Sequence, residues 1–539
     1  MVKILICQLN PILGDFEGNL KKITESLKHR ESYDVAVFPE LSLSGYMPLD
    51  LIFDPSFITR QNHALSQLLQ FAKDKLVIIG GIDSSHGEKP FYNSLFLLHE
   101  GEIKAKYHKM CLPTYDVFDE KRYFSEGQKP LVFQHMNQKF ALSICEDIWA
   151  AANEVKETNY ANHPFHAYQD VDVIINISAS PFVKGKIHQR IELLAKLAKN
   201  YNSKIVYCCQ TGGQDGIVFD GGSLVFNQLG EVCTFMKVFD EDTQVVDLQN
   251  LLPQEYQILN PYDEIEKAII MGIKDFFYKQ GFKSCLVGLS GGIDSSLTLY
   301  LAVKALGASH VQAFMIPSLF TSDMSIEDAG KIAELMNVKI LSAPLGKVLT
   351  ELEEMVKAQT SYQLKDITHQ NMQSRLRGLF LMAMSNQTDA LVITTGNKSE
   401  VAVGYSTLYG DTCGAFAPIA DLFKMEVYGL AKHIQKKEHV FPERVFIKAP
   451  SAELARDQKD EDNLPPYVLL DEILKLILEE NYSLEKILET KKFPEDIVRW
   501  VVKKVFQMEY KRQQYCPVVK LSKKTFNTGR KVPIVQKFY

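Results

Sequence analysis

The first half of the chain alternates short apolar runs with polar turns. Runs of this length predict buried strands at Ile4–Leu9, Val35–Phe38, Leu76–Gly80, Ser94–His99, Phe140–Ile144, Val173–Ile177, Ile205–Cys209 and Leu224–Phe226. Apolar residues at helical spacing predict helices over Asn19–Lys28 and Ile187–Lys199, and His99–Glu102 is typical of a hairpin turn. This mixture predicts a layered α/β or α+β domain over residues 1–245.

The second half alternates strands and helices. The pattern predicts helix Tyr262–Gln280, strand Cys285–Gly288, a helix after Asp294, strand Val311–Ile316, helix Ser325–Asn337, and strands Lys339–Leu341 and Ala390–Thr394. Strands separated by helices predict right-handed βαβ units in a doubly wound parallel sheet. The ligand site of such a sheet lies beyond the C-terminal ends of its strands.

The residues between the two halves, from about 242 to 262, lose clear periodicity and include Pro253 and Pro261. We therefore expect a connecting arm over residues 246–262, with domains at 1–245 and 263–539. A chain of 539 residues is long enough for two cores.

Composition and charge narrow the class of protein. The net charge is −6 and no long basic run occurs, which argues against nucleic acid as the main partner. No apolar run approaches the roughly 18 residues of a membrane span, and the first residues lack the pattern of a signal peptide. The nine cysteines include no CxxC pair and no zinc spacing. We expect a soluble protein of the reducing cytoplasm, with neither nucleic acid nor a membrane as its partner.

A Ser/Gly-rich turn, Gly288–Ser296, joins a predicted strand to the start of a predicted helix. Unpaired N–H groups and the helix dipole favour a phosphate at such a place, and glycine allows close approach. Asp294 would repel phosphate unless a cation lies between them, and Mg²⁺ is the expected mediator. The turn lacks the lysine of a Walker A motif, so it differs from an ordinary P-loop.

Three polar residues of the first half follow predicted strands: Glu40, Lys109 and Cys145. Singly they fit a helix cap, a solvated charge and a small core residue, although Cys145 directly precedes two acids. Together they supply a nucleophile, a base and a cation for amide cleavage.

The short segments that contain Glu40, Lys109 and Cys145 resemble, in their order and surroundings, the nitrilase/amidase superfamily. The resemblance covers roughly residues 1–240. The resemblance implies a four-layer αββα domain with Cys145 as nucleophile, Glu40 as base and Lys109 as third member. In the glutamine-using branch, the positions that match Tyr115, Ser180 and Lys186 contact the substrate.

Further polar segments of the second half are less specific one by one. Asn371 and Arg375 share a helical face, with Arg377 offset, and this stretch alone favours a solvated helix face. The acidic stretch 457–462 is typical of a mobile loop over a site, and the basic tail 509–539 fits either a solvated end or a phosphate-binding arm.

Ser290–Ser296 resembles the pyrophosphate loop of the ATP pyrophosphatases. With Thr395–Glu400, Gly404–Asp411 and Pro450–Leu454 it resembles the NAD⁺ synthetases, whose domain is Rossmann-like, of the adenine nucleotide alpha hydrolase type. With the nitrilase-like domain in front, nearly the whole chain resembles the glutamine-dependent branch of that family. Arg456-Asp457, Lys459 and Thr412-Cys413 depart from the family pattern, which bears on closure of the loop and not on the chemistry.

The resemblance also implies site residues, Mg²⁺ and a homo-oligomer. ATP would be bound by Gly288, Leu289, Ser290, Gly291, Gly292, Ile293, Asp294, Ser295 and Thr395. Nicotinic acid adenine dinucleotide (deamido-NAD⁺) would be bound by Asn371, Glu400 and Lys511, and Mg²⁺ by Asp294 and Glu400.

The implied reaction adenylates deamido-NAD⁺ with ATP and displaces AMP with ammonia released from glutamine. Because ammonium is not nucleophilic, we expect a protected passage for ammonia. One alternative is an amidotransferase with another acceptor, against which Thr395–Glu400 argues. Another is a degenerate, regulatory first half, against which the presence of Glu40, Lys109 and Cys145 argues.

Overall fold

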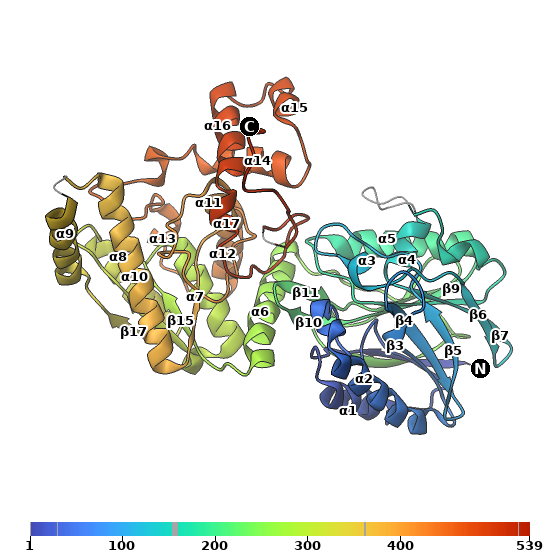
Figure 1. Ribbon diagram of the computed structural model, residues 1–539. Coiled ribbons are helices and arrows are strands. Elements are labelled where there is room, and N and C mark those ends of the chain that lie inside the picture. Colours follow the sequence, from blue (N-terminus) through green and yellow to red (C-terminus); the bar gives the residue numbers. More distant parts are fainter. Residues whose placement is uncertain (1, 30, 153–159, 361–362, 527) are drawn as a thin grey trace. The chain divides into compact units, whose positions relative to one another are not determined.

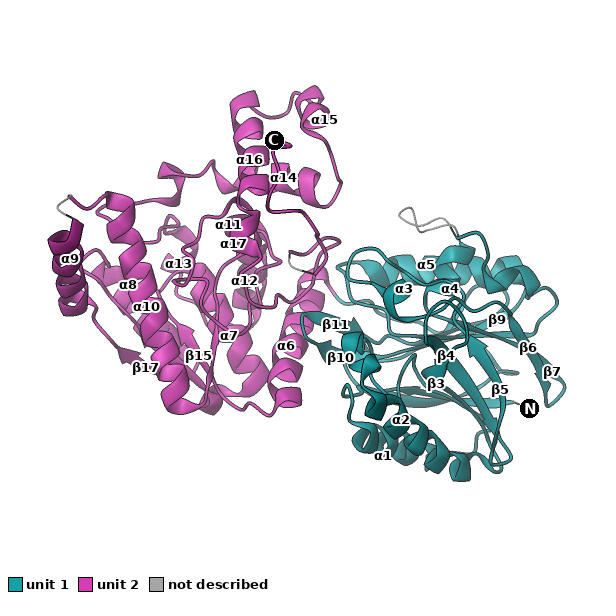
Figure 2. Ribbon diagram, viewed as in Figure 1, with its two compact units in different colours: residues 1–259 teal, residues 260–539 magenta. Residues whose placement is uncertain are grey.

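The strands of the first half form two six-stranded sheets, seen at the right of Figure 1 in the computed structural model. The structure describes residues 2–29, 31–152, 160–360, 363–526 and 528–539. The chain divides into two units, Met1–Leu259 and Asn260–Tyr539, coloured teal and magenta in Figure 2.

Each sheet of unit 1 mixes parallel and antiparallel strands. The first sheet has the order β14 (Asp242–Asp247), β1 (Lys3–Gln8), β2 (Val35–Val37), β3 (Leu76–Ser84), β4 (Phe91–His99) and β5 (Glu102–His108). The second has the order β13 (Val232–Phe235), β12 (Leu224–Phe226), β9 (Lys204–Cys209), β8 (Val173–Ser178), β7 (Gln138–Ile144) and β6 (Leu131–His135). A separate hairpin pairs β10 (Thr211–Gln214) with β11 (Ile217–Asp220).

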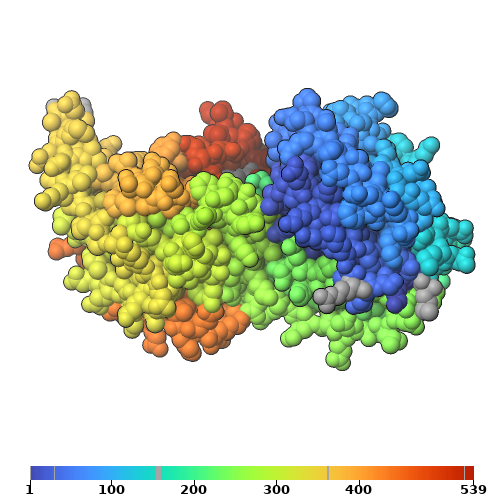
Figure 3. All heavy atoms as spheres, turned by 90° about the horizontal axis from the view of Figure 1, so that it is seen from below, coloured from blue at the N-terminus to red at the C-terminus, as the bar shows by residue number. Residues whose placement is uncertain are grey.

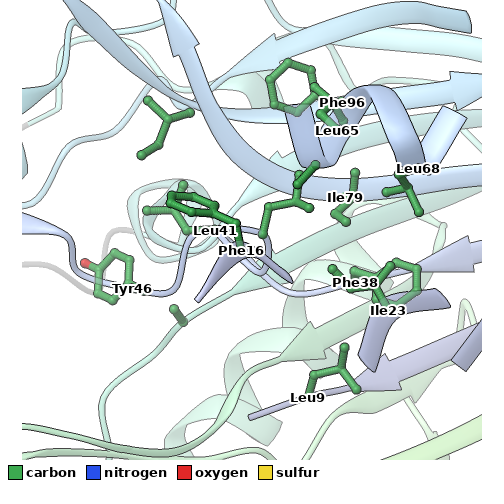
Figure 4. Close-up of a cluster of buried hydrophobic side chains, with 14 of the residues drawn as sticks. Leu9, Phe16, Ile23, Phe38, Leu41, Tyr46, Leu65, Leu68, Ile79 and Phe96 are labelled. Atoms are coloured by element: carbon green, nitrogen blue, oxygen red, sulfur yellow. The ribbon is translucent and has the colours of Figure 1, made fainter. Parts of the chain in front are cut away.

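Helices cover the outer faces of the two sheets. They are α1 (Phe16–Leu27), η1 (Leu49–Phe53), α2 (Pro55–Leu68), η2 (Leu69–Ala72), α3 (Glu120–Tyr123), α4 (Glu146–Ala151), η3 (Pro164–Ala167) and α5 (Lys186–Tyr201). One apolar core lies between the sheets, where Ile4 and Ile6 meet Phe140 and Leu142. A second core lies between α1, α2 and the first sheet, and Figure 4 shows Phe16, Ile23, Leu65 and Ile79 within it. A third packs α5 onto the second sheet.

This arrangement confirms the expected four-layer αββα sandwich. Every strand expected in unit 1 is present, with ends shifted by a few residues. The sequence pattern missed the partly exposed strands β5, β6 and β13 and the glycine-containing β10. Residues 242–247, expected to be irregular, instead form β14, which pairs antiparallel with β1. Their weak periodicity follows from the position of β14 at the sheet edge, where most of its side chains are half-buried.

The core of unit 2 is a four-stranded parallel sheet, as expected. Its order is β17 (Lys339–Ser342), β16 (Val311–Met315), β15 (Cys285–Gly288) and β18 (Leu391–Ile393). β15 comes first in the chain but lies inside the sheet, so the connections run to opposite sides of it. The C-terminal ends of β15 and β18 therefore lie at a topological switch point, where α/β sheets bind ligands.

Helices surround this sheet and extend beyond it. They are α6 (Pro261–Gln280), α7 (Ile293–Leu306), η4 (Ala308–His310), α8 (Asp323–Leu335), α9 (Gly346–Thr360), α10 (Asp366–Thr388), α11 (Lys398–Val403), α12 (Lys424–Glu438), α13 (Arg444–Ile447), η5 (Asp460–Asp462), α14 (Tyr467–Leu478), α15 (Leu484–Glu489), α16 (Glu495–Gln507) and α17 (Glu509–Arg512). The helices α11, α14, α15 and α16 share an apolar core.

Leu349 is the one buried residue of α9, and this helix projects from the surface of its unit as the yellow segment in Figure 3. Within the described ranges, no helix combines the length and the apolar character needed to cross a membrane.

Candidate active sites

Glu40 and Lys109 meet in the interior of unit 1. Glu40 follows β2 and Lys109 follows β5, and both side chains are wholly buried. Lys109 Nζ lies 2.8 Å from Glu40 Oε1, which also accepts a 2.7 Å hydrogen bond from Asn93. The other oxygen, Oε2, accepts from the backbone N–H of Ala179 at 2.8 Å. These contacts fix the orientation of a buried carboxylate, as a catalytic base requires.

A second carboxylate, that of Glu120, faces the same ammonium group. Glu120 Oε1 lies 2.8 Å from Lys109 Nζ and accepts a 2.8 Å hydrogen bond from the Tyr46 hydroxyl. Burial raises the pKa of Glu120 to about 7, against the opposing effect of Lys109. Burial alone would lower the pKa of Lys109, but Glu120 and Glu40 outweigh it and hold that pKa well above its usual value. Lys109 is therefore a permanent cation between two acids.

Cys145 occupies a sharp turn between β7 and α4. Its φ of +42° lies in the region that only glycine adopts freely, and its N–H donates to Ile177 O at 2.8 Å. Burial, and next the charge of Glu40, raise the pKa of the Cys145 thiol well above its usual value, whereas Lys109 acts to lower it. The resting group is therefore a thiol, which needs a base to become a nucleophile.

Polar side chains surround the residue that follows Cys145. The Glu146 carboxylate accepts hydrogen bonds from the hydroxyls of Tyr115, at 3.1 Å, and Tyr160, at 3.0 Å. Burial raises the pKa of Glu146, opposed mainly by Lys109. Lys186, the first residue of α5, donates to Pro181 O at 3.0 Å, and burial lowers its pKa. Ser180, just beyond β8, is buried.

Unit 2 contains a cavity of about 840 Å³ at the switch point of its sheet. Every residue that the sequence predicted for ATP, deamido-NAD⁺ or metal lines it: Gly288 to Ser295, Asn371, Thr395, Glu400 and Lys511. Segments more than 200 residues apart in the chain thus converge on one space.

The loop between β15 and α7 takes the expected form. Gly291 has a φ of +80°, and a Cβ there would come within 2.4 Å of Ser325 O, so only glycine fits. The Ser295 hydroxyl lies 3.0 Å from the Ser290 hydroxyl and 3.2 Å from the Ser290 N. These contacts hold the loop open at the N-terminus of α7, which favours an anion.

Asp294, Glu400 and Lys424 form a charged cluster in the cavity wall. Lys424 Nζ lies 2.5 Å from Asp294 Oδ2 and 3.5 Å from Glu400 Oε1. Burial raises the pKa of Glu400 to about 8, Lys424 opposing this effect and Asp294 adding to it. Asp460, the first residue of η5, also lines the cavity. Its negative charge helps to raise the pKa of Lys424. The described residues contain no set of three or more His, Cys, Asp or Glu arranged around a metal position.

Residues 449–462 form part of the cavity wall, although their acidic composition suggested a mobile loop. The Glu453 carboxylate accepts hydrogen bonds from Ser322 and Ser325, each at 2.9 Å, and pairs with Lys448 at 2.7 Å. Gln373 donates to Leu454 O at 2.9 Å. The loop is thereby attached to α8 and α10.

The helix α10 lines the cavity along one side, and two of its polar residues there are Asn371 and Arg377. Asn371 accepts a 2.8 Å hydrogen bond from Thr407, and Arg377 donates through Nε to Ile316 O at 2.9 Å. Arg375 is exposed and does not line the cavity. The solvated interpretation therefore holds for Arg375 alone. Lys511, on α17, donates to Gly404 O at 2.7 Å and to Ser406 O at 2.6 Å.

Some residues at the two sites were not predicted from the sequence. They are Glu120, Asn93, Glu146 and Tyr160 in unit 1, and Arg377, Lys424, Lys448, Glu453 and Asp460 in unit 2. Glu146 follows Cys145 directly, and Arg377, Glu453 and Asp460 lie in segments that the sequence singled out without giving these residues a role. The others carried no local signal.

Comparison with known proteins identifies a family for each half. The carbon-nitrogen hydrolase family model matches residues 3–256, and the NAD synthase model matches residues 265–515. The glutamine-dependent NAD(+) synthetase of Thermotoga maritima is 38% identical over 100% of this chain and 99% of that protein. The protein of the same name from Acinetobacter baylyi is 38% identical over 99% of this chain and 98% of that protein.

Solved structures agree with the sequence comparison. The glutamine-dependent NAD+ synthetase of Acinetobacter baumannii, in complex with ADP, is 35% identical, with a TM-score of 0.78 over 99% of this chain and 98% of that one. The enzyme of the same name from Cytophaga hutchinsonii is 20% identical, with a TM-score of 0.84 over the same shares, which supports the fold alone.

Proposed function

This chain belongs to the family of glutamine-dependent NAD(+) synthetases, and we propose from this which residues carry out each step of the reaction. The enzyme is a carbon-nitrogen ligase that amidates deamido-NAD⁺ at the expense of ATP, with glutamine as nitrogen donor. Unit 2 carries out the adenylation and the amidation. Unit 1 releases ammonia from glutamine.

The observation that carries the proposal is the convergence on one 840 Å³ cavity of the 288–295 loop with Asn371, Thr395, Glu400 and Lys511. Gly288 to Ser295, with Thr395, bind ATP, and the loop holds the pyrophosphate that leaves. Asn371, Glu400 and Lys511 contact deamido-NAD⁺. The cavity volume lies within the range of sites that enclose small ligands.

Asp294 and Glu400 fit a Mg²⁺ ion. Both carboxylates contact the Lys424 ammonium, so together they already bind one cation. Mg²⁺ is commonly held by one or two carboxylates together with substrate phosphates and water. When bound, the ion would neutralise phosphate charge next to Asp294. Lys424 holds the two acids when no metal ion lies between them.

Adenylation begins when a carboxylate oxygen of the nicotinate attacks the α-phosphorus of ATP. The bond to the β-phosphate oxygen breaks, and pyrophosphate leaves into the N–H groups and hydroxyls of the 288–295 loop. Ammonia then attacks the activated carbonyl carbon, AMP departs with the electron pair of the C–O bond, and the nitrogen loses a proton. The Lys424 ammonium contacts Asp294 in the wall of the cavity, and we propose that it stabilises negative charge that develops there during the reaction.

In unit 1, Glu40 takes the proton of the Cys145 thiol, and the sulfur attacks the side-chain amide carbon of glutamine. The raised pKa of Cys145 explains why a base is needed. Lys109 steadies the negative charge on the amide oxygen, and Glu40 returns its proton to the leaving ammonia. Water, deprotonated by Glu40, then hydrolyses the thioester to glutamate. Tyr115, Ser180 and Lys186 bind glutamine, and Glu146 adds a carboxylate suited to its α-ammonium group.

An assay of the purified chain tests this function. Deamido-NAD⁺ and Mg-ATP are supplied with either glutamine or ammonium chloride, and NAD⁺, AMP and pyrophosphate are quantified. With either nitrogen source we expect NAD⁺, AMP and pyrophosphate in equal amounts. When glutamine is the nitrogen source, glutamate should form in the same amount as NAD⁺. Release of ADP and phosphate in place of AMP and pyrophosphate would contradict the proposal.

The domain organisation, the compartment and the assembly also belong to the proposal. Domains at 1–245 and 263–539, joined by an arm at 246–262, remain the proposed boundaries. All nine cysteines are free, which supports a reducing cytoplasm. A homo-oligomer, which the resemblance to the family implies, is the proposed assembly. Sedimentation of the purified protein tests the assembly.

A further inference from the structure

Asn397 lies at the junction between β18 and α11 and is wholly buried. Its side-chain oxygen accepts a hydrogen bond from the Glu400 N–H at 3.1 Å, and its own N–H donates to Glu400 Oε2 at 3.3 Å. This reciprocal pair is a capping box, which explains a residue of this type at the start of a helix. It uses the oxygen of the side chain and leaves the amide nitrogen for another role.

The amide nitrogen of Asn397 reaches the neighbouring strand end. Nδ2 donates a 3.0 Å hydrogen bond to Asp294 Oδ1, on the first turn of α7. β15 and β18, which lead to these two helices, are adjacent and parallel, with Val287 opposite Ile393. Asn397 therefore connects the two loops of the switch point. Capping requires only an acceptor, so the contact with Asp294 has a separate cause.

We infer that Asn397 is a positioning residue of the synthetase site, which holds the carboxylates of Asp294 and Glu400 in the orientation in which they share one cation. This inference rests on the proposed function. With Asn397 on Oδ1, Asp294 presents Oδ2, and Lys424 Nζ lies 2.5 Å from that oxygen. The same side chain fixes the backbone of Glu400. Removing such an outer partner of a cation site costs about 10–100-fold in affinity or activity.

The two residues after Asn397 are anchored independently of it. Lys398 pairs with Asp421 at 2.9 Å inside the protein, and both side chains are wholly buried. The Ser399 hydroxyl accepts a 2.9 Å hydrogen bond from the backbone N–H of Lys424 and donates one to the Asp471 carboxylate. The backbone of this segment and the start of α12 are thus held in place without the amide of Asn397. A variant that lacks only this donor keeps the framework.

Two substitutions separate positioning from capping. Asn397→Ser keeps a hydroxyl that can accept for the helix cap, but its shorter side chain does not reach Asp294, and Asn397→Ala loses both contacts. We expect both variants to bind ATP in the presence of Mg²⁺ about tenfold more weakly than the parent in calorimetry, with ATP binding in EDTA unchanged. Only Asn397→Ala should also lower the melting temperature through loss of the cap. Ammonia-driven synthesis should fall in both, mainly in kcat.

A double-mutant cycle tests whether Asn397 acts through Asp294. In an Asp294→Asn background, Asn397→Ser should cause no further loss of Mg²⁺-dependent ATP binding. Additive losses, or an Asn397→Ser variant with parental Mg²⁺-dependent binding, would overturn the inference. A parent protein that binds no ATP would instead contradict the proposed function, so the two failures are distinguishable. Hydrolysis of glutamine to glutamate in unit 1 provides the control for folding.

Discussion

The ammonium group of Lys109 lies 2.8 Å from a carboxylate oxygen of Glu120 in the interior of unit 1. Glu40 lies equally close on the same nitrogen, so one cation faces two acids. A buried group of two carboxylates and one ammonium would carry a net negative charge, which is costly without water. Protonation of Glu120 relieves this charge, in keeping with its pKa of about 7.

Glu120→Gln should lower glutamine-driven synthesis about a hundredfold, because Lys109 loses one of the two carboxylates that fix it near the reacting amide. Ammonia-driven synthesis should stay at the parental level. Glu126→Gln, at an exposed acid that pairs with Lys121, is a matched control and should leave both activities unchanged. Equal activity of parent and Glu120→Gln with glutamine would show that Glu120 has no part in the site.

The pH dependence of stability provides a second test of Glu120. Its pKa rises from 4.5 unfolded to about 7 folded, so the folded state holds a proton that the unfolded state releases. The stabilisation is complete below pH 4.5 and is lost as pH rises to 7, with a slope of at most about 1.4 kcal/mol per pH unit. In calorimetric melts over this window, Glu120→Gln should therefore lose less stability than the parent. Identical slopes for the two proteins would contradict the raised pKa.

Cys145→Ala should reduce glutamine-driven synthesis by more than about a thousandfold and leave ammonia-driven synthesis within about twofold of the parent. The substitution removes the nucleophilic sulfur of unit 1, whereas the ammonia-driven reaction takes place at the site in unit 2. The initial rate of NAD⁺ formation with each nitrogen source measures both effects. Asp294→Ala is the opposite control and should lose both activities. If Cys145→Ala lost both equally, the proposed division of labour would be wrong.

Lys424→Met should lower ammonia-driven synthesis about a hundredfold while glutamine hydrolysis in unit 1 continues. The charge of Lys424 lowers the pKa of Glu400, so its removal should raise that pKa beyond about 8 and move the pH–rate profile to higher pH. Lys424→Arg, which keeps the charge in a different shape, should restore part of the rate and most of the profile. A profile that did not move in Lys424→Met would exclude this electrostatic role.

Glu453→Gln should loosen residues 449–462 by weakening their contacts with α8. Although burial opposes it, the hydrogen bonds from Lys448 and Ser322 hold the pKa of Glu453 below its usual value, so the group is ionised at pH 7. Charge-assisted hydrogen bonds contribute about 1.5 kcal/mol or more, which corresponds to about a tenfold rise in the KM for ATP. Limited proteolysis should cut this loop faster in the variant. Glu461→Gln, at an exposed acid of the same loop, should behave as the parent.

The sequence predicted the sites well wherever a functional residue directly follows an apolar run. Glu40 and Cys145 lie at the ends of apolar runs, whereas Lys109 follows β5, a partly exposed strand without such a run. Glu120 and Lys424 carry no such signal, since each looks like an ordinary charge at the start of a helix. Their importance arises from burial against partners more than 10 residues away in the chain, which no local pattern contains.

Strands, like site residues, were predicted best where the chain contains a continuous apolar run. Strands buried on both faces, such as β8, were recognised as continuous apolar runs, and the parallel sheet of unit 2 was predicted from alternation alone. The strands that were missed include half-exposed edges, such as β6, and the glycine-containing β10. There the hydrogen-bonding partner, and not the side-chain pattern, determines the conformation.

The pairing of β14 with β1 joins the last strand of unit 1 to its first, with Lys3 opposite Asp247. During synthesis on the ribosome, β1 can pair with β2 early, but its other edge has no partner until residues 242–247 have emerged. An unpaired edge is a template for association with other chains. The edge of β1 therefore stays open throughout the translation of the glutaminase unit, until β14 pairs with it and becomes the edge strand in its place.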